Sequence, residues 1–62
     1  MNRTKQIRQT KGLRQIDLAR KADISLTWVW ALENGLESRV SAPIKKRVAK
    51  ALDSTEEELF AR

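Results

Sequence analysis

The sequence contains neither cysteine nor histidine, and only two glycines and one proline occur among its 62 residues. Without cysteine no disulfide or thiolate chemistry is possible, and without both residue types the usual zinc sites cannot form. A glycine-rich phosphate loop and a nucleophile paired with a base are missing too, so we expect no enzymatic activity. Stability must come from one apolar core, and we predict neither a metal nor a cofactor.

Long hydrophobic runs are also missing. The longest unbroken apolar run is the five residues from Trp28 to Leu32, whereas a membrane-spanning helix needs about 20. The basic start, Met1 to Lys5, is not followed by an apolar stretch of signal-peptide length. We therefore expect a cytoplasmic protein without membrane contact, folded as a single domain over residues 1–62 with a core at about 4–60.

Positive charge is what the sequence has in excess, with 13 Lys and Arg against 8 Asp and Glu. Residues 1–22 carry seven cations and one acid (7 − 1 = +6), and residues 36–50 carry five cations and one acid (5 − 1 = +4). Residues 23–35, between them, hold two acids and no cation. Two basic stretches flanking a cation-free centre favour a nucleic-acid partner. The alternative is a basic surface that only keeps the protein in solution.

The spacing of apolar residues predicts five short helices and no sheet, because strand-like alternation is missing. Gly12 and Gly35 are expected to end helices, and Pro43 to lie in the first turn of another. In the first helix Ile7 is the expected inward anchor. The predicted helices cover about residues 3–11, 15–22, 25–34 and 41–52, with a last one from Ser54 onward.

Local signals indicate how several of these helices begin or end. Asp23 interrupts the apolar pattern and is among the few residue types tolerated at positive φ, so we expect a tight turn there. Ser25 is expected to cap the third helix with its hydroxyl. Ser54 and Glu57 have the spacing of a capping box for the last helix.

The second and third helices, over Gln15–Leu32, have the length and spacing of a helix-turn-helix unit. Such a unit holds two helices at a steep angle, so that the second can enter a DNA major groove. Ala19 is small where the helices would approach closest. The same periodicity fits any small helical bundle, so spacing alone leaves DNA binding open. The positions that must be buried in such a unit are Leu18, Ala19, Ile24, Val29 and Leu32.

A longer pattern is more specific, and it consists of Leu13, Gln15, Leu18, Ala19, Ala22, Ile24, Ser25, Val29, Leu32, Glu33, Gly35, Val48, Ala49, Lys50, Ala51, Leu52, Glu58, Leu59 and Phe60. Over about residues 4–60 it resembles the phage-repressor and Cro-type helix-turn-helix family, also called XRE-type. The resemblance implies an all-α, compact five-helix domain of the lambda-repressor-like type, whose third helix is the recognition helix. It further implies binding to a pseudo-palindromic duplex as a homodimer, and we predict a nucleoid-associated transcriptional regulator that acts as a repressor.

The resemblance also implies roles for single residues. Gln15 and Asn34 match positions that contact the DNA backbone, and Arg8 and Glu33 match a structural ion pair. The base-facing positions are Ser25, Leu26, Thr27, Trp30 and Ala31. Further backbone contacts are expected from Arg14, Trp28, Arg39, Lys45 and Lys46.

The predicted recognition helix departs from the family because residues 25–31 contain no Arg, Lys, Asn or Gln, the usual readers of guanine and adenine. Leu26, Trp30 and Ala31 would instead meet thymine methyl groups, which predicts A·T-rich sites and low sequence stringency. Trp28 is expected to be half-buried, and Trp30 to be exposed toward either DNA or a protein partner.

An alternative function is a protein-interaction module, antitoxin-like or otherwise partner-binding, that kept the fold and lost the DNA. It would use Trp28 and Trp30 together with Leu26 and Leu36. For a homodimer contact, the apolar candidates are Leu36, Val40, Leu59 and Phe60.

Overall fold

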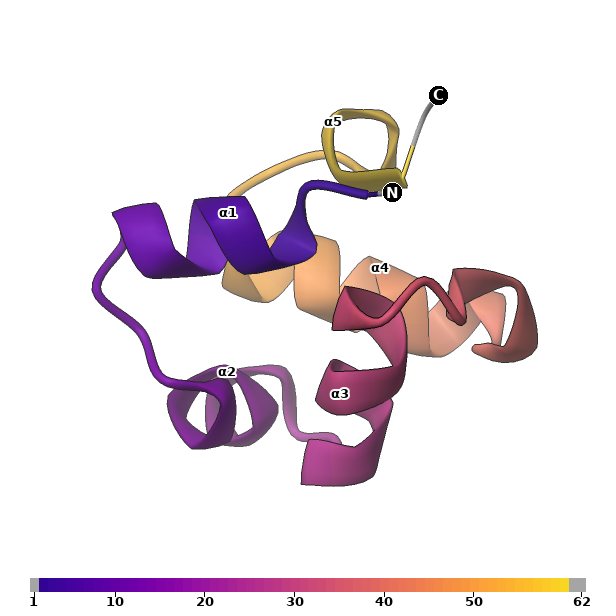
Figure 1. Cartoon of the computed structure of the whole chain (residues 1–62), viewed down its shortest axis with the longest axis horizontal. Helices are drawn as coiled ribbons and strands as arrows, with labels where there is room; N and C mark the ends of the chain where they lie inside the picture. Colours follow the sequence, from indigo (N-terminus) through magenta and orange to yellow (C-terminus); the bar gives the residue numbers. More distant parts are fainter. Residues whose placement is uncertain (1, 61–62) are drawn as a thin grey trace.

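The computed structural model describes residues 2–60, and helices are the only regular secondary structure in this part of the chain (Figure 1). The predicted all-α fold with five α-helices is confirmed, and a short 3-10 helix, η1, lies in the predicted loop between the third and fourth of them. Residues 1, 61 and 62 of the predicted domain lie outside the described part. The elements are α1 (Thr4–Thr10), α2 (Gln15–Ala22), α3 (Leu26–Glu33), η1 (Glu37–Arg39), α4 (Ala42–Ala51) and α5 (Glu56–Phe60).

The tight turns fall where the sequence predicts them. Gly12 and Gly35 both have positive φ, at +71° and +80°, which a residue without a Cβ adopts without strain. Asp23 follows α2 in the left-handed conformation with φ 57° and ψ 50°. Pro43 lies in the first turn of α4, where its missing N–H costs no helical hydrogen bond.

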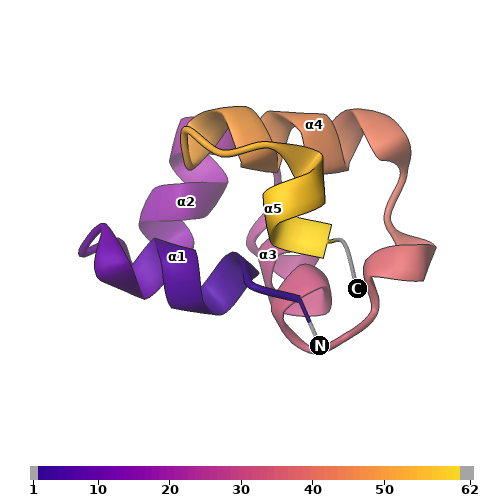
Figure 2. The ribbon, with the colours of Figure 1, turned by 90° about the horizontal axis from the view of Figure 1, so that it is seen from above.

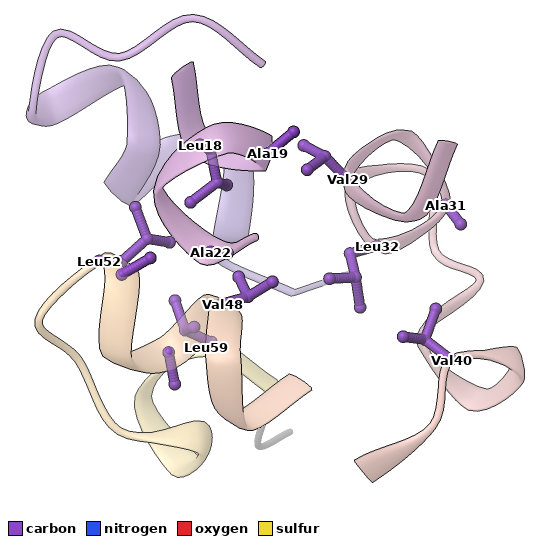
Figure 3. Packing of buried hydrophobic residues seen from close by; sticks show 12 residues of the cluster. Leu18, Ala19, Ala22, Val29, Ala31, Leu32, Val40, Val48, Leu52 and Leu59 are labelled. Carbon is purple, nitrogen blue, oxygen red and sulfur yellow. The ribbon is translucent and has the colours of Figure 1, made fainter. Parts of the chain in front are cut away.

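The core is formed mainly where α2 lies between α3 and α4 (Figure 3). Leu18, Val29, Leu32, Val48, Leu52 and Leu59 are completely buried. Of the five positions predicted to be buried in the helix pair, only Ile24 remains partly exposed. Its side chain still packs against the core cluster.

Helix α1 packs against the core through Ile7, as predicted, but Ile7 is not its most buried side chain. Ile7 is only partly buried, and the buried side chains of this helix are Thr4 and Arg8. The Thr4 Oγ1 has no hydrogen-bond partner among residues 2–60. Arg8 can be buried because its guanidinium finds acceptors on other elements, as described below.

The capping box of α5 lies one residue later than predicted. The Glu58 amide donates to Thr55 Oγ1 at 3.1 Å, and the Thr55 amide donates to Glu58 Oε1 at 3.2 Å. Ser54 is instead needed to end α4, because its amide bonds to the Ala49 carbonyl at 2.9 Å after Asp53, which has φ 52°. The Ser54–Glu57 prediction is therefore wrong.

The N-terminal segment is fastened to two distant parts of the fold. Asn2 Nδ2 donates to the Leu32 carbonyl at 2.6 Å and to Glu37 Oε2 at 3.2 Å, while its Oδ1 accepts the Thr4 amide at 3.0 Å. The Arg3 amide donates to the Leu59 carbonyl at 2.8 Å. The beginning of the chain thereby lies beside both the end of α3 and α5 (Figures 1 and 2).

Candidate nucleic-acid interface

Helices α2 and α3 form the predicted helix-turn-helix unit. Figure 1 shows α2 nearly along its axis and α3 from the side, so the two axes cross steeply. Ala19, 2% exposed, lies at their contact, and its small side chain allows the close approach. The Ile24 amide closes the turn by donating to the Ala19 carbonyl at 2.9 Å.

A buried hydrogen-bonded network fixes this unit to α1. Arg8 Nε and Nη2 donate to the two carboxylate oxygens of Glu33 at 2.6 and 3.1 Å, and the side chains are 8% and 2% exposed. Arg8 Nη1 donates to the Leu13 carbonyl at 2.6 Å. The structure thus brings the predicted ion pair together, and it aligns the end of α3 with α1 and with the approach to α2.

Gln15 joins the same network, although it was predicted to contact a DNA phosphate. Its Nε2 donates to Glu33 Oε1 at 3.1 Å, which holds the first residue of α2 against the last residue of α3. An amide nitrogen carries two hydrogens, so the second can still serve a phosphate. Gln15 is partly exposed, as that role requires.

The exposed face of α3 contains a shallow, mostly apolar hollow of about 280 Å³. It is lined by Gln15 from α2 and by Leu26, Thr27 and Trp30 from α3. Trp30 is 51% exposed and Leu26 is 45% exposed. Three of the predicted base-facing residues therefore share one surface with a predicted backbone-contacting residue.

The other two predicted base-facing residues differ in position. Ser25 is exposed and is the N-cap residue of α3, but its hydroxyl makes no capping hydrogen bond. Ala31 is only 9% exposed and belongs to the core cluster, so its predicted contact with a base is wrong. Its methyl points from the side of α3 opposite to Val29 (Figure 3), and the η1 segment packs against that helix.

Trp28 and Trp30 lie on different sides of α3. Trp28 is 39% exposed, which is more than the predicted half-buried position implies, and it does not line the hollow. Successive residues of a helix are rotated by about 100° around its axis, so side chains two residues apart differ by about 200°. Measured the shorter way around the axis, this is about 160°. The two rings therefore do not form one continuous surface.

Arg14 and Asp17 form an exposed pair at the start of α2. The Arg14 amide donates to Asp17 Oδ2 at 2.8 Å, and Arg14 Nε and Nη2 donate to the same carboxylate at 3.0 Å each. The side-chain and backbone hydrogen bonds from Arg14 lower the pKa of Asp17 to about 2, and Arg20 adds a smaller electrostatic contribution. The carboxylate in turn raises the pKa of Arg14. Asp17 thus forms the acidic half of a capping box, whereas the Arg14 side chain caps no amide of α2.

The remaining predicted backbone contacts are spread from the end of α3 to the start of α4. Asn34 is exposed, and its Nδ2 donates to the Trp30 carbonyl at 2.8 Å. Arg39 and Lys46 are exposed. Lys45 is partly buried, with its Nζ 5.8 Å from the centre of the Phe60 ring, and it is directed to the α5 side of α4.

Two residues that hold this interface together were not predicted. Asp17 caps α2, and its position three residues after Arg14 is the spacing of the acidic member of a capping box. Asn2 ties the chain start to the end of α3. No sequence pattern indicates the second contact, because its partner is the backbone of a residue 30 positions away.

A closed core, a left-handed turn between two steeply crossed helices and an exposed second helix define a helix-turn-helix protein. A family model described as a helix-turn-helix domain matches residues 3–61, and the chain belongs to this family of XRE-like domains. The match supports DNA binding, and the family is typically non-enzymatic.

Comparisons with curated proteins and with solved structures found no significant match. Among residues 2–60 no helix is both long enough and apolar enough to cross a membrane.

Proposed function

We propose that the domain is a transcriptional repressor that binds double-stranded DNA with α3 in the major groove. The observation that carries this proposal is the hollow lined by Gln15, Leu26, Thr27 and Trp30. It combines an apolar surface suited to thymine methyl groups with an amide at the helix N-terminus suited to a phosphate. Thr27 is the only hydroxyl in the hollow, so base discrimination is weak and favours A·T-rich sites.

Affinity on this proposal comes mainly from phosphate contacts around the recognition helix. Arg14 directly before α2, Arg39 in η1 and Lys46 in α4 are exposed cations. Each neutralised phosphate releases counterions and steepens the salt dependence of binding. Lys45 adds a phosphate contact once its Nζ leaves the Phe60 ring, and Trp28 donates its indole N–H to a phosphate. Two copies bind the half-sites of a pseudo-palindromic duplex.

The experiment is a fluorescence titration of the domain with A·T-rich and G·C-rich duplexes at two salt concentrations. Trp30→Ala is expected to raise Kd for the A·T-rich duplex about tenfold, which corresponds to about 1.4 kcal/mol, and to leave the salt slope unchanged. Replacing thymine by uracil in the duplex should weaken the wild type by a similar factor, because uracil lacks the methyl group. Lys46→Gln is expected to lower the salt slope by about 1.

Two variants serve as controls for this titration. Gln9→Ala removes an exposed polar side chain on α1, outside the hollow, and Lys5→Gln removes an exposed charge on the same helix. Both should bind like the wild type. Absence of binding at low salt, or binding without salt dependence, contradicts the DNA proposal.

Failure of that experiment would favour the second candidate function, a protein-interaction module. Its supporting observation is that the exposed large apolar side chains of residues 2–60 lie on α3 or directly after it, namely Leu26, Trp28, Trp30 and Leu36. Because the two tryptophans face different sides, a single protein partner would use Trp30 and Leu26 rather than both rings. The flanking cations, which a protein partner does not require, favour DNA.

A further inference from the structure

A second basic surface lies between α2 and α4, away from the recognition helix. It is a shallow groove of about 340 Å³, lined by Lys21, Ala22, Arg47, Lys50 and Ala51. Three of these five residues are cations and the other two are alanines. The lining therefore contains no acidic side chain to neutralise the cations and no large apolar side chain.

The groove and the α3 hollow lie at opposite ends of α2. The hollow includes Gln15, the first residue of this helix, and the groove includes Lys21 and Ala22, its last two. An eight-residue helix is about 12 Å long. Figure 2 shows α2 running from beside α1 toward α4, whose Arg47, Lys50 and Ala51 supply the rest of the lining.

Helix termini explain only part of this charge. Lys21 and Lys50 occupy the last turns of α2 and α4, where cations interact favourably with unpaired carbonyl groups. Arg47 is not in the last turn of α4, yet it lines the same groove. Its Nη1 donates to the Asp23 carbonyl at 3.3 Å, which steadies the guanidinium and leaves its other N–H groups available.

We propose that this groove is a second phosphate-binding site, which holds the backbone of another DNA duplex while α3 occupies the first. Three cations around the groove suit the successive phosphates of a DNA backbone. A protein partner would find only two alanine methyl groups as apolar contacts, whereas protein interfaces depend on large buried anchors. The inference rests on the proposed function, since α3 must hold the first duplex. The domain would then bridge two DNA segments.

The experiment measures bridging directly. A random duplex is immobilised on beads and saturated with protein, the beads are washed, and a fluorescent second duplex is added at low salt. The wild type should retain the second duplex. The Lys21→Gln/Lys50→Gln variant leaves the Arg47 hydrogen bond intact and should lower retention at least about fivefold, with Kd for a single duplex within about twofold of the wild type.

The matched control is Lys5→Gln/Lys11→Gln, which removes the same charge from exposed positions at α1, and it should bridge like the wild type. Equal retention by both double variants would overturn the proposal. Bridging would then arise from two associated copies of the protein, each of which holds one duplex with its recognition helix. A reduced single-duplex affinity confined to the groove variant would also overturn it, since the groove would then serve the first duplex. Failure to retain a second duplex has the same consequence, whereas failure to bind the first contradicts the proposed function instead.

Discussion

Glu33 connects three helices through one buried carboxylate. It accepts hydrogen bonds from Arg8 on α1 and from Gln15 on α2 while belonging to α3. Taking both charges out of water is costly, so the pair need not stabilise the domain relative to an apolar replacement. Its importance lies in orientation, because the same carboxylate fixes Gln15 at the edge of the hollow.

Removing this carboxylate should be strongly destabilising. Glu33→Ala leaves the Arg8 guanidinium buried without its partner, and we expect the free energy of unfolding to fall by about 3–5 kcal/mol, measured by urea denaturation. Arg8→Met/Glu33→Leu should recover most of this loss, because no charge then remains buried. Glu57→Ala, on the exposed start of α5, should cost less than about 1 kcal/mol. A Glu33→Ala loss as small as the Glu57→Ala loss would contradict the account.

Ala31 and Gln15 show where residue-level prediction from the sequence reaches its limit. Helical periodicity correctly placed Trp30 outside and Val29 inside, because both positions depend on the packing of α2 against α3. Whether Ala31 is covered depends on the chain that returns after Gly35, which periodicity within α3 does not describe. The Gln15–Glu33 contact likewise joins residues 18 positions apart and forms only in the assembled fold.

At the scale of elements, α2 begins with only the acidic half of a capping box, which comes from its third residue. Asp17 accepts the Arg14 amide and also holds the Arg14 side chain. Because its pKa in the folded state, about 2, lies below its ordinary value of 3.8, Asp17 stabilises the fold above about pH 4. This contribution is lost as the pH falls toward 2.

An NMR titration of the Asp17 carboxyl group should therefore give a midpoint near 2. Arg14→Ala should move this midpoint upward, since the side-chain hydrogen bond is the largest cause of the lowered pKa, but the remaining backbone amide keeps it below the ordinary value. An unchanged midpoint in Arg14→Ala would show that the pair does not form in solution.

The error at α5 has a simple physical origin. Ser54 and Glu57, and Thr55 and Glu58, offer two overlapping capping boxes with the same spacing. The choice between them is made by α4, whose end uses the left-handed Asp53 and the Ser54 amide. The existence of the last helix was predictable from its own residues, whereas its first residue depended on the preceding helix.

For the whole molecule, the helix count and the helix-turn-helix pair were predictable because the buried stripes of α2 and α4 are regular. The apolar surface left for self-association was not predictable from the sequence. Val40 and Leu59 were expected to be available for a dimer contact, but they are 4% and 0% exposed and belong to the core. Of the four predicted positions, Leu36 is exposed and Phe60 is partly buried beneath Lys45.

The predicted dimer contact is thus reduced to Leu36 and Phe60, which leads to a prediction about assembly. A stable dimer generally buries at least about 1,200 Å², which two such side chains do not supply. We expect sedimentation velocity to show a monomer for the free domain at micromolar concentration and two copies on a duplex with two half-sites. A single copy on that duplex would remove the homodimer proposal, and a dimer without DNA would contradict the surface argument.

The hydrogen bond from the Arg3 amide to the Leu59 carbonyl places the two ends of the described chain next to each other, at the end of the molecule remote from the start of α3 (Figure 1). A short linker could therefore join them, and a circular permutant opened in the segment around Gly35 would keep the same core. For the same reason the domain can be inserted as a unit into a surface loop of a carrier protein, with α3 directed outward.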